Sequence, residues 1–435
     1  MNTVKELLRF IDRSPTAFHS VRSAAEVLEE NGFTALCEGD PWTLEAGEGY
    51  YVTRNQSSII AFRMPVGTPA HFLIAASHTD SPMFKLKNES VVPAFDRYTT
   101  LNSEEYGSTI YSSWLDRPLT LAGRVVLSKN GTFTSKLVYI DRDLLVIPNV
   151  AIHFNRNVNA GYAYNPATDL RPLLCEGKDI TVKALIAREL GCTEEEIVGT
   201  ELFVCNRAKG TTVGASEEFF LSPRIDNLMC AFGSLDGFVK TKNPTSVNIW
   251  FAADNEETGS ATKQGAGSMF LSDVIDRICE STQVDRRRLL AASMMVSADN
   301  AHAKHPNHPE MSDAQNAPHM NGGVVIKTHA SQKYTTDAMS AAIFEHICTA
   351  AGVPVQHYAN RSDMVSGGTL GSISNTHVPL LSVDIGMAQL AMHSACETAG
   401  CRDAEYLCAA MQAFYESNLI ASGDGCVSLN RSRNE

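Results

Sequence analysis

Side chains that can bind metal ions follow three apolar segments of the sequence. They are His78 after residues 72–76, Glu256 and Glu257 after residues 247–253, and Asp299 after residues 293–297. Ligands bind at the carboxyl ends of strands in open α/β sheets, so this coincidence indicates one shared site. Strand ends are also commonly polar, and any one of these acids alone could be a solvated loop residue.

Two short spacings suggest roles for the acids. Asp80 lies two residues after His78, and residues two apart on an extended segment face the same side. Asp80 could therefore hold the imidazole N–H that His78 does not use on a metal. Glu256 and Glu257 are adjacent and would point to opposite sides of a strand end, so one could bind a metal and the other accept a proton from water. Alone, the pair could equally be a surface acidic dipeptide.

Asp226 and the histidines leave more than one interpretation open. Asp226 lies where a loop enters a helix, so its carboxylate could cap that helix or bridge two cations. His393 lies beyond the last apolar strand, and a single histidine is more often structural than a ligand. Three further histidines recur at every third residue, beside prolines that prevent a regular helix, which favours a loop at a pocket rim. They are His302, His305 and His308.

The elements that must position these residues are a mixture of strands and helices. An amphipathic helix is expected from Ser14 as N-cap and Pro15 as first residue to Asn31, and helical patterning resumes at Asp226. Between them, residues 90–220 alternate β-branched and polar residues, with a hairpin signal at Asn130-Gly131. The pattern predicts an α/β domain made of residues 1–89 and 221–435, interrupted by a β-rich domain at 90–220.

Composition excludes several classes of function. The 435 residues hold 36 Lys and Arg against 49 Asp and Glu, a net charge of −13 that disfavours nucleic acid and anionic membranes as partners. No apolar run reaches the about 18 residues of a membrane helix, and the charged first residues do not form a signal peptide, so a cytoplasmic protein is expected. The eleven cysteines form no C-x-x-C pair, which favours reduced thiols over a cysteine zinc site.

Ordered motifs along nearly the whole chain resemble the aspartyl aminopeptidase family of dinuclear zinc peptidases. The motifs are SPTAFH (14–19), SHTDSP (77–82), SPRIDNL (222–228), DNEETGS (254–260), SADNAHAKHPNH (297–308) and AMHS (391–394). The resemblance implies a mixed-sheet α/β/α metallopeptidase domain with an inserted β-rich dimerisation domain. It also implies two Zn²⁺ per subunit, which Co²⁺ or Mn²⁺ can replace.

The resemblance assigns roles to individual residues. The implied metal ligands are His78, Asp226, Glu257, Asp299 and His393. Asp226 would bridge both ions, Glu256 would act as general base, and Asp80 would orient His78. Such a dinuclear site lowers the pKa of a water molecule and polarises the scissile carbonyl.

Substrate-binding positions are implied in the same way. His153 would reach the active site of a neighbouring subunit, Lys327 and Tyr334 would line the substrate pocket, and Gly367, Gly368 and Thr369 would hold the substrate backbone. Thr258 departs from the hydrophobic residue usual before Gly259, which should not disturb ligation. The window 361–369 also departs from the family pattern, which leaves the fine substrate preference open.

The resulting functional hypothesis is a homo-oligomeric aminopeptidase, with dimers assembling into a dodecamer, that releases N-terminal Asp or Glu from peptides with a free N-terminus. Lys327 could pair with the substrate side-chain carboxylate, or it could simply face solvent. Other hypotheses are a broad-specificity or leucine-type dizinc aminopeptidase, a scaffold protein that lost catalysis, and a carboxypeptidase or deacylase.

Overall fold

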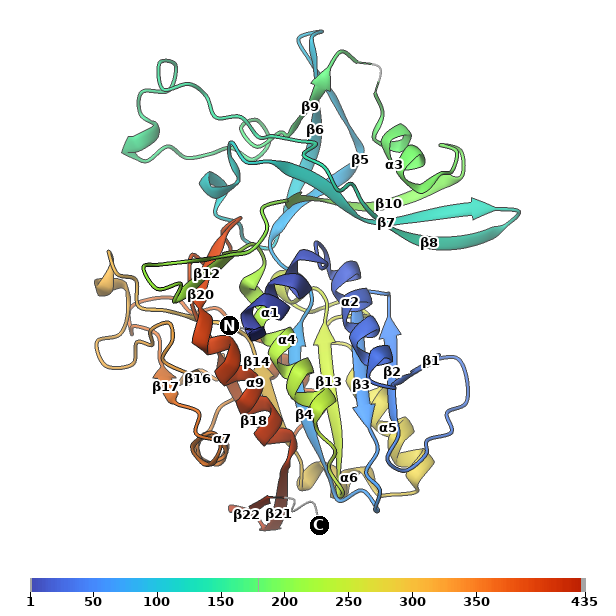
Figure 1. Cartoon of the computed structure of the whole chain (residues 1–435), viewed down its shortest axis with the longest axis vertical. Helices are drawn as coiled ribbons and strands as arrows, with labels where there is room; N and C mark the ends of the chain where they lie inside the picture. Colours follow the sequence, from blue (N-terminus) through green and yellow to red (C-terminus); the bar gives the residue numbers. More distant parts are fainter. Residues whose placement is uncertain (1, 179, 432–435) are drawn as a thin grey trace.

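The computed structural model describes residues 2–178 and 180–431. An α/β unit with helices on both faces of a sheet forms the lower part of Figure 1, and an antiparallel β-rich unit lies above it. Within the described residues, no helix combines the length and the apolar character needed to cross a membrane.

The sheet of the α/β unit is mixed and has the order β1-β2-β3-β13-β4-β14-β18-β16-β17. Its central strands β13, β4, β14 and β18 are parallel, whereas β3 and β16 run antiparallel to their central neighbours. β4, β13 and β14 are buried along their whole length, as short apolar runs predict. The strands are β1 (Thr34–Leu36), β2 (Gly49–Arg54), β3 (Ser58–Arg63), β4 (His71–His78), β13 (Ser246–Ala253), β14 (Met294–Ala298), β16 (Val324–Lys327), β17 (Val355–Tyr358) and β18 (Leu381–Gly386).

Helices cover both faces of this sheet, so the expected α/β/α architecture is confirmed. One face packs against α1 (Asn2–Asp12), α2 (Ala17–Glu30), α4 (Ile225–Lys240), α7 (Ala338–Ala350) and α9 (Cys401–Tyr415). The other packs against α5 (Phe270–Thr282), α6 (Arg286–Ala291) and α8 (Leu370–Ser374). Trp250 on the first face and Phe251 on the second are 1% exposed, which shows how alternate strand residues fill the two cores.

The β-rich unit is an antiparallel sheet in the order β8-β7-β10-β5-β6-β9. The hairpin predicted at Asn130-Gly131 is confirmed, because Lys129 pairs with Thr132. The strands are β5 (Met83–Ala94), β6 (Tyr98–Tyr106), β7 (Leu119–Lys129), β8 (Thr132–Tyr139), β9 (Leu173–Glu176) and β10 (Ile197–Asn206), with α3 (Val182–Leu190) packed against them. The expected boundaries at 90 and 220 fall inside strands, and we propose 83–206 as the extent of the inserted unit.

Shorter elements complete the chain. A small sheet consists of β11 (Thr211–Val213), β12 (Phe219–Ser222), β20 (Glu397–Gly400), β19 (Ala388–Leu390) and β15 (Ala301–His302). A hairpin pairs β21 (Ser417–Gly423) with β22 (Cys426–Arg431). The 3₁₀ turns are η1 (Tyr111–Trp114), η2 (Val158–Ala160), η3 (Glu256–Thr258) and η4 (Pro309–Met311).

Two local expectations are wrong. The N-cap of α2 is Thr16 rather than Ser14, because Thr16 is extended and its carbonyl oxygen accepts the Ser20 N–H at 2.9 Å. The polar composition of residues 428–435 predicts a frayed end, but residues 428–431 pair with β21 as part of β22; residues 432–435 lie outside the described residues.

Candidate metal centre

The three segments that end in metal-capable residues lie side by side in the central sheet. β13, β4 and β14 are parallel neighbours, and Ala253 pairs with His78 in register. Parallel neighbours bring their carboxyl ends to one edge, so the side chains that follow them meet there. The prediction of a shared location for His78, Glu257 and Asp299 is confirmed.

Asp226 enters this edge from the irregular first turn of α4, just after β12. The N-cap of α4 is Arg224, and Asp226 has a non-helical φ of −79° and ψ of 112°. Among the described residues, Asp226 Oδ1 accepts no hydrogen bond and Oδ2 faces His393 Nε2, so the carboxylate does not cap a helix and that interpretation is wrong. Its backbone N–H donates to Glu397 Oε2 at 3.0 Å, and its side chain faces the strand ends.

The two carboxylate oxygens of Asp226 face different sets of side chains. On one side, His78 Nε2 lies 3.6 Å from Asp226 Oδ1 and 3.5 Å from Asp299 Oδ1. On the other side, His393 Nε2 lies 3.4 Å from Asp226 Oδ2 and 3.4 Å from Glu257 Oε2. Asp226 thus separates two groups of ligand atoms, each with one imidazole nitrogen and one further carboxylate.

The protonation of the two histidines decides what these groups can bind. His78 Nδ1 lies 3.1 Å from the carbonyl oxygen of Asp80, and His393 Nδ1 lies 2.7 Å from that of Ser108. A carbonyl oxygen only accepts, so each Nδ1 carries a proton and each Nε2 is left facing carboxylate oxygens. Although burial acts in the opposite direction, contact with Asp226 raises the pKa of His78 well above its usual value and that of His393 to about 9. A cation that binds between Nε2 and these carboxylates therefore displaces the Nε2 proton.

The residues fit zinc by distance and by chemistry. Two ligands of a tetrahedral zinc, each about 2.0–2.1 Å from the metal, are about 3.4 Å apart, close to the measured separations. Nitrogen and carboxylate ligands suit this metal, and no cysteine is required. Asp226 Oδ1 and Glu257 Oε1 are buried without a hydrogen-bond partner among the described residues, as expected for oxygens reserved for a metal.

The burial and close approach of the carboxylates also favour a bound cation at this centre. Burial and the charge of Asp226 raise the pKa of Glu257 well above its usual value, and burial raises the pKa of Glu256 to about 8. Carboxylates this close together and this deeply buried repel one another, and divalent cations offset that repulsion. The His393 side chain is 29% exposed whereas those of His78 and Glu257 are 1% and 4% exposed, so solvent reaches the centre from the side of His393.

Glu256 and Glu257 lie in the 3₁₀ turn η3 rather than on an extended strand end, so the reason expected for their divergence is wrong. Asp80 holds this turn through both of its oxygens. Oδ1 accepts the N–H of Glu256 and Oδ2 that of Glu257, each at 3.2 Å. Asp80 Oδ1 also lies 3.4 Å from His78 Nδ1, so the contact expected from the two-residue spacing is present.

Sequence reasoning missed two residues that hold this arrangement. Tyr106, from β6 of the β-rich unit, donates to Asp80 Oδ2 at 2.6 Å. Glu397 accepts the backbone N–H of Asp226 at 3.0 Å and that of His393 at 2.8 Å. Neither residue has a local sequence signal, because each contact joins segments far apart in the chain.

Comparison with known proteins also indicates a zinc site. The family model described as "Aminopeptidase I zinc metalloprotease (M18)" matches residues 10–415. A probable M18 family aminopeptidase 2 of Clostridium novyi is 43% identical over 423 residues, which cover 94% of this chain and 98% of that protein. This chain belongs to the M18 family of zinc metalloproteases. It is therefore a zinc aminopeptidase, a peptide hydrolase.

Solved structures extend the similarity to the fold. Ape4, seen by cryo-electron microscopy in complex with Nbr1, aligns with a TM-score of 0.92 and 34% identity over 95% of this chain and 85% of that one. A dodecamer of S. cerevisiae mApe1 aligns with a TM-score of 0.83 and 26% identity over 94% of this chain and 95% of that one. The expected fold class is confirmed.

In this M18 aminopeptidase, the residues expected in a substrate pocket fall into two groups. Lys327 ends β16 and is 2% exposed, with its Nζ donating to the Asp299 carbonyl oxygen at 2.7 Å and lying 5.1 Å from the ring centroid of Tyr334. The alternative that Lys327 faces solvent is wrong. Thr369, which follows Gly368, donates through Oγ1 to Asp384 Oδ1 at 2.6 Å, so the segment expected to hold the substrate is anchored to β18.

Neither His153 nor the His302 group joins the two ligand groups, although His302 lies close enough to Asp226 for that carboxylate to act on its pKa, which burial lowers. His153 is exposed in the segment between β8 and β9 of the β-rich unit. His302 is on β15, with its ring centroid 6.1 Å from that of Tyr358, and His308 Nδ1 pairs with Glu310 Oε1 at 3.2 Å on the surface. The structure therefore does not add these histidines to the Asp226 ligand groups.

Proposed function

We propose that this M18 aminopeptidase removes N-terminal Asp and Glu from peptides with a dinuclear zinc centre. The proposed ligands are His78, Asp226 and Asp299 for one ion, and His393, Asp226 and Glu257 for the other. The observation that carries this proposal is that the two oxygens of Asp226 face the two imidazole Nε2 atoms separately, at 3.6 and 3.4 Å. Co²⁺ or Mn²⁺ should support the same chemistry, because both accept nitrogen and carboxylate ligands.

When bound, the zinc ions activate water and polarise the scissile carbonyl. The chain's part in the reaction is proton transfer. Glu256 takes a proton from the attacking water and delivers it to the leaving amine. Burial raises the pKa of Glu256 to about 8, so the carboxylate can both accept and release a proton near neutral pH. Asp80 fixes the backbone of Glu256 and holds the His78 ring, so it acts as a positioning group.

Lys327 supports the preference for acidic residues. Its ammonium group is buried, and only one of its three N–H donors is accounted for, by the Asp299 carbonyl. Across the described residues, no carboxylate lies within ion-pair distance of Lys327. A substrate carboxylate would supply the missing counter-charge, with Tyr334, Gly368 and Thr369 forming the rest of the pocket.

We also propose that the protein is a homo-oligomer in which dimers assemble into a dodecamer. The solved mApe1 of S. cerevisiae is a dodecamer. His153 is exposed in the β-rich unit of its own chain, a position from which it could enter the site of a neighbouring subunit.

The specificity is tested with Asp-, Glu- and Leu-anilides on the wild type and Lys327→Met. The wild type should hydrolyse the Asp and Glu substrates faster than the Leu substrate. The variant should lose this preference and retain Leu hydrolysis, because the pocket then lacks its cation. Equal rates on all three substrates, unchanged by the substitution, would contradict acid specificity and leave the zinc centre untouched.

A further inference from the structure

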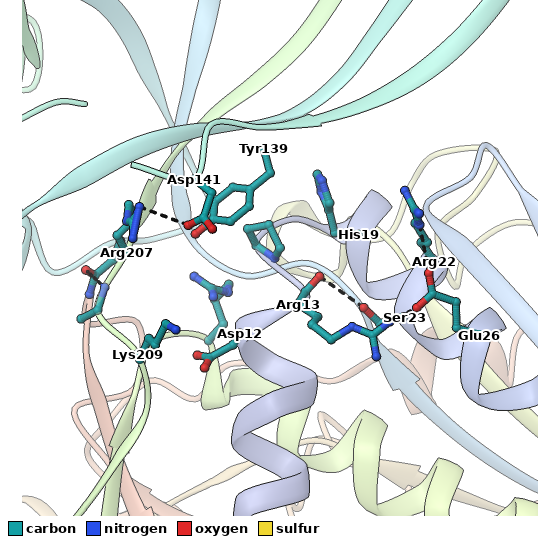
Figure 2. Close-up of a pocket in the computed structure, with 14 residues that line it drawn as sticks. Asp12, Arg13, His19, Arg22, Ser23, Glu26, Tyr139, Asp141, Arg207 and Lys209 are labelled. Atoms are coloured by element: carbon teal, nitrogen blue, oxygen red, sulfur yellow. Dashed lines mark hydrogen bonds and ion pairs between the residues drawn. The ribbon is translucent and has the colours of Figure 1, made fainter. Parts of the chain in front are cut away.

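A cavity of about 380 Å³ lies between the α/β unit and the β-rich unit, away from the Asp226 ligand groups. Its walls come from the end of α1, the first turns of α2, the end of β8, the segment after β10, and the loop before α4 (Figure 2). Its volume is in the range of small-molecule sites in proteins.

Cationic side chains outnumber acidic ones in this cavity, although the chain as a whole carries a net charge of −13. The cationic lining residues are Arg13, Arg22, Arg207, Lys209 and Arg224, and the acidic ones are Asp12, Glu26 and Asp141. A concave surface with an excess of one sign of charge favours ligands of the other sign. The cavity is therefore suited to an anion, unlike most of this molecule.

Three of the cations are already paired. Arg13 and Arg22 share Glu26, and Arg207 lies 3.1 Å from Asp141. Lys209 and Arg224 differ: in residues 2–178 and 180–431, no carboxylate lies within ion-pair distance of either. Asp12 is the acidic group that acts on both from farther away, and Lys209 extends toward it in Figure 2.

Arg224 is held in place with part of its guanidinium unused. Its Nη2 donates to the Ile11 carbonyl oxygen at 3.2 Å, while its Nε is buried without a hydrogen-bond partner among the described residues. A buried guanidinium with a free N–H is costly unless an oxyanion accepts from it. The planar fork of arginine binds the paired oxygens of carboxylate and phosphate groups.

We propose that this cavity binds a small molecule through an oxyanion group, either phosphate or carboxylate, that lies between Arg224 and Lys209. Arg224 would supply the fixed donors and Lys209 the mobile charge. The site is separate from the zinc ligands, and it requires neither peptide hydrolysis nor a preference for acidic substrates. Arg224 precedes Asp226 by two residues, so the loop that forms one wall of this cavity also carries the carboxylate shared by the two ligand groups.

The test is calorimetric titration of the zinc-loaded enzyme at constant ionic strength, with inorganic phosphate in one arm and succinate in the other. The charge-reversal variant Lys209→Glu is compared with Lys242→Glu, which makes the same change at another exposed lysine, just after α4. Both positions are exposed, so both variants should fold. The proposal predicts saturable millimolar binding of at least one probe, weakened about tenfold or more by Lys209→Glu and less than about twofold by Lys242→Glu.

Comparing the two arms shows whether the oxyanion is phosphate or carboxylate. Absence of binding in both arms would overturn the proposal. Binding that is the same in the wild type and in Lys209→Glu would also overturn the proposal. If that binding disappears only when zinc is removed, the anion occupies the metal centre instead of this cavity. None of these outcomes depends on peptidase activity.

Discussion

Tyr106 donates a 2.6 Å hydrogen bond to Oδ2 of Asp80, the carboxylate whose other oxygen lies 3.4 Å from His78 Nδ1. Tyr106 belongs to the β-rich unit, whereas Asp80 follows the central strand β4. Asn255 donates to the same phenol oxygen at 2.9 Å, so the tyrosine is fixed from both sides. The inserted unit therefore contributes directly to the geometry of the metal centre.

Tyr106→Phe should weaken zinc binding about tenfold and lower kcat by a similar factor. The substitution removes a donor to a buried carboxylate that orients His78, and losses of this size follow from such changes around metal ligands. Zinc affinity by chelator competition, together with kcat and KM, checks this prediction. Tyr111→Phe is the matched control, because Tyr111 makes a 2.6 Å bond to the exposed Glu105 in the same unit. Equal behaviour of the two variants would contradict a positioning role for Tyr106.

Glu256→Gln should retain zinc and lose turnover by a factor of about 10²–10⁴, because an amide cannot accept the proton of the attacking water. Glutamine preserves the size of the side chain, and the backbone N–H of residue 256 can still donate to Asp80. Zinc content by elemental analysis and kcat on an Asp-anilide measure the two effects separately. Glu280→Gln, at an exposed position on α5, serves as control. Near-normal turnover would remove Glu256 from the mechanism.

His71 should make the protein less stable in acid. It is fully buried at the start of β4, neither ring nitrogen has a hydrogen-bond partner in the described part of the chain, and burial lowers its pKa to about 4. Protons therefore bind the unfolded state more readily. The stability that neutral His71 contributes is complete above pH 6.5 and is lost as the pH falls toward 4.

The loss specific to His71 between pH 7 and pH 5 should be about 2 kcal/mol. Urea denaturation of wild type and His71→Leu at the two pH values measures it, because metal release affects both proteins equally. His346→Leu, at an exposed position on α7, should keep the wild-type pH dependence. A parallel loss of stability in wild type and His71→Leu would contradict the prediction.

Sequence reasoning succeeded where the signal was local. The apolar runs of β4, β13 and β14 are short and uninterrupted, so both the strands and the residues at their ends could be predicted. The spacing of His78 and Asp80 likewise predicted a contact that the structure contains. The selection of Asp226 and His393 as ligands came from family resemblance, because neither spacing favoured a metal role over a structural one.

What the sequence could not show depends on contacts between distant segments. Asp226 resembles a helix cap locally, but its backbone N–H is bound by Glu397, 171 residues further along the chain, and its carboxylate faces the strand ends instead. Tyr106 reaches Asp80 only because β6 is folded back over the end of the central sheet. Similarly, η3 replaces the expected extended segment because Asp80 binds its two N–H groups.

The central claim is that Asp226 bridges two zinc ions, and anomalous scattering at the zinc edge from crystals of the zinc-loaded enzyme tests it most directly. The account predicts two peaks per chain, about 3.5–4 Å apart. One should lie among His78, Asp226 and Asp299, and the other among His393, Asp226 and Glu257. A single peak, or two peaks that do not both contact Asp226, would contradict it.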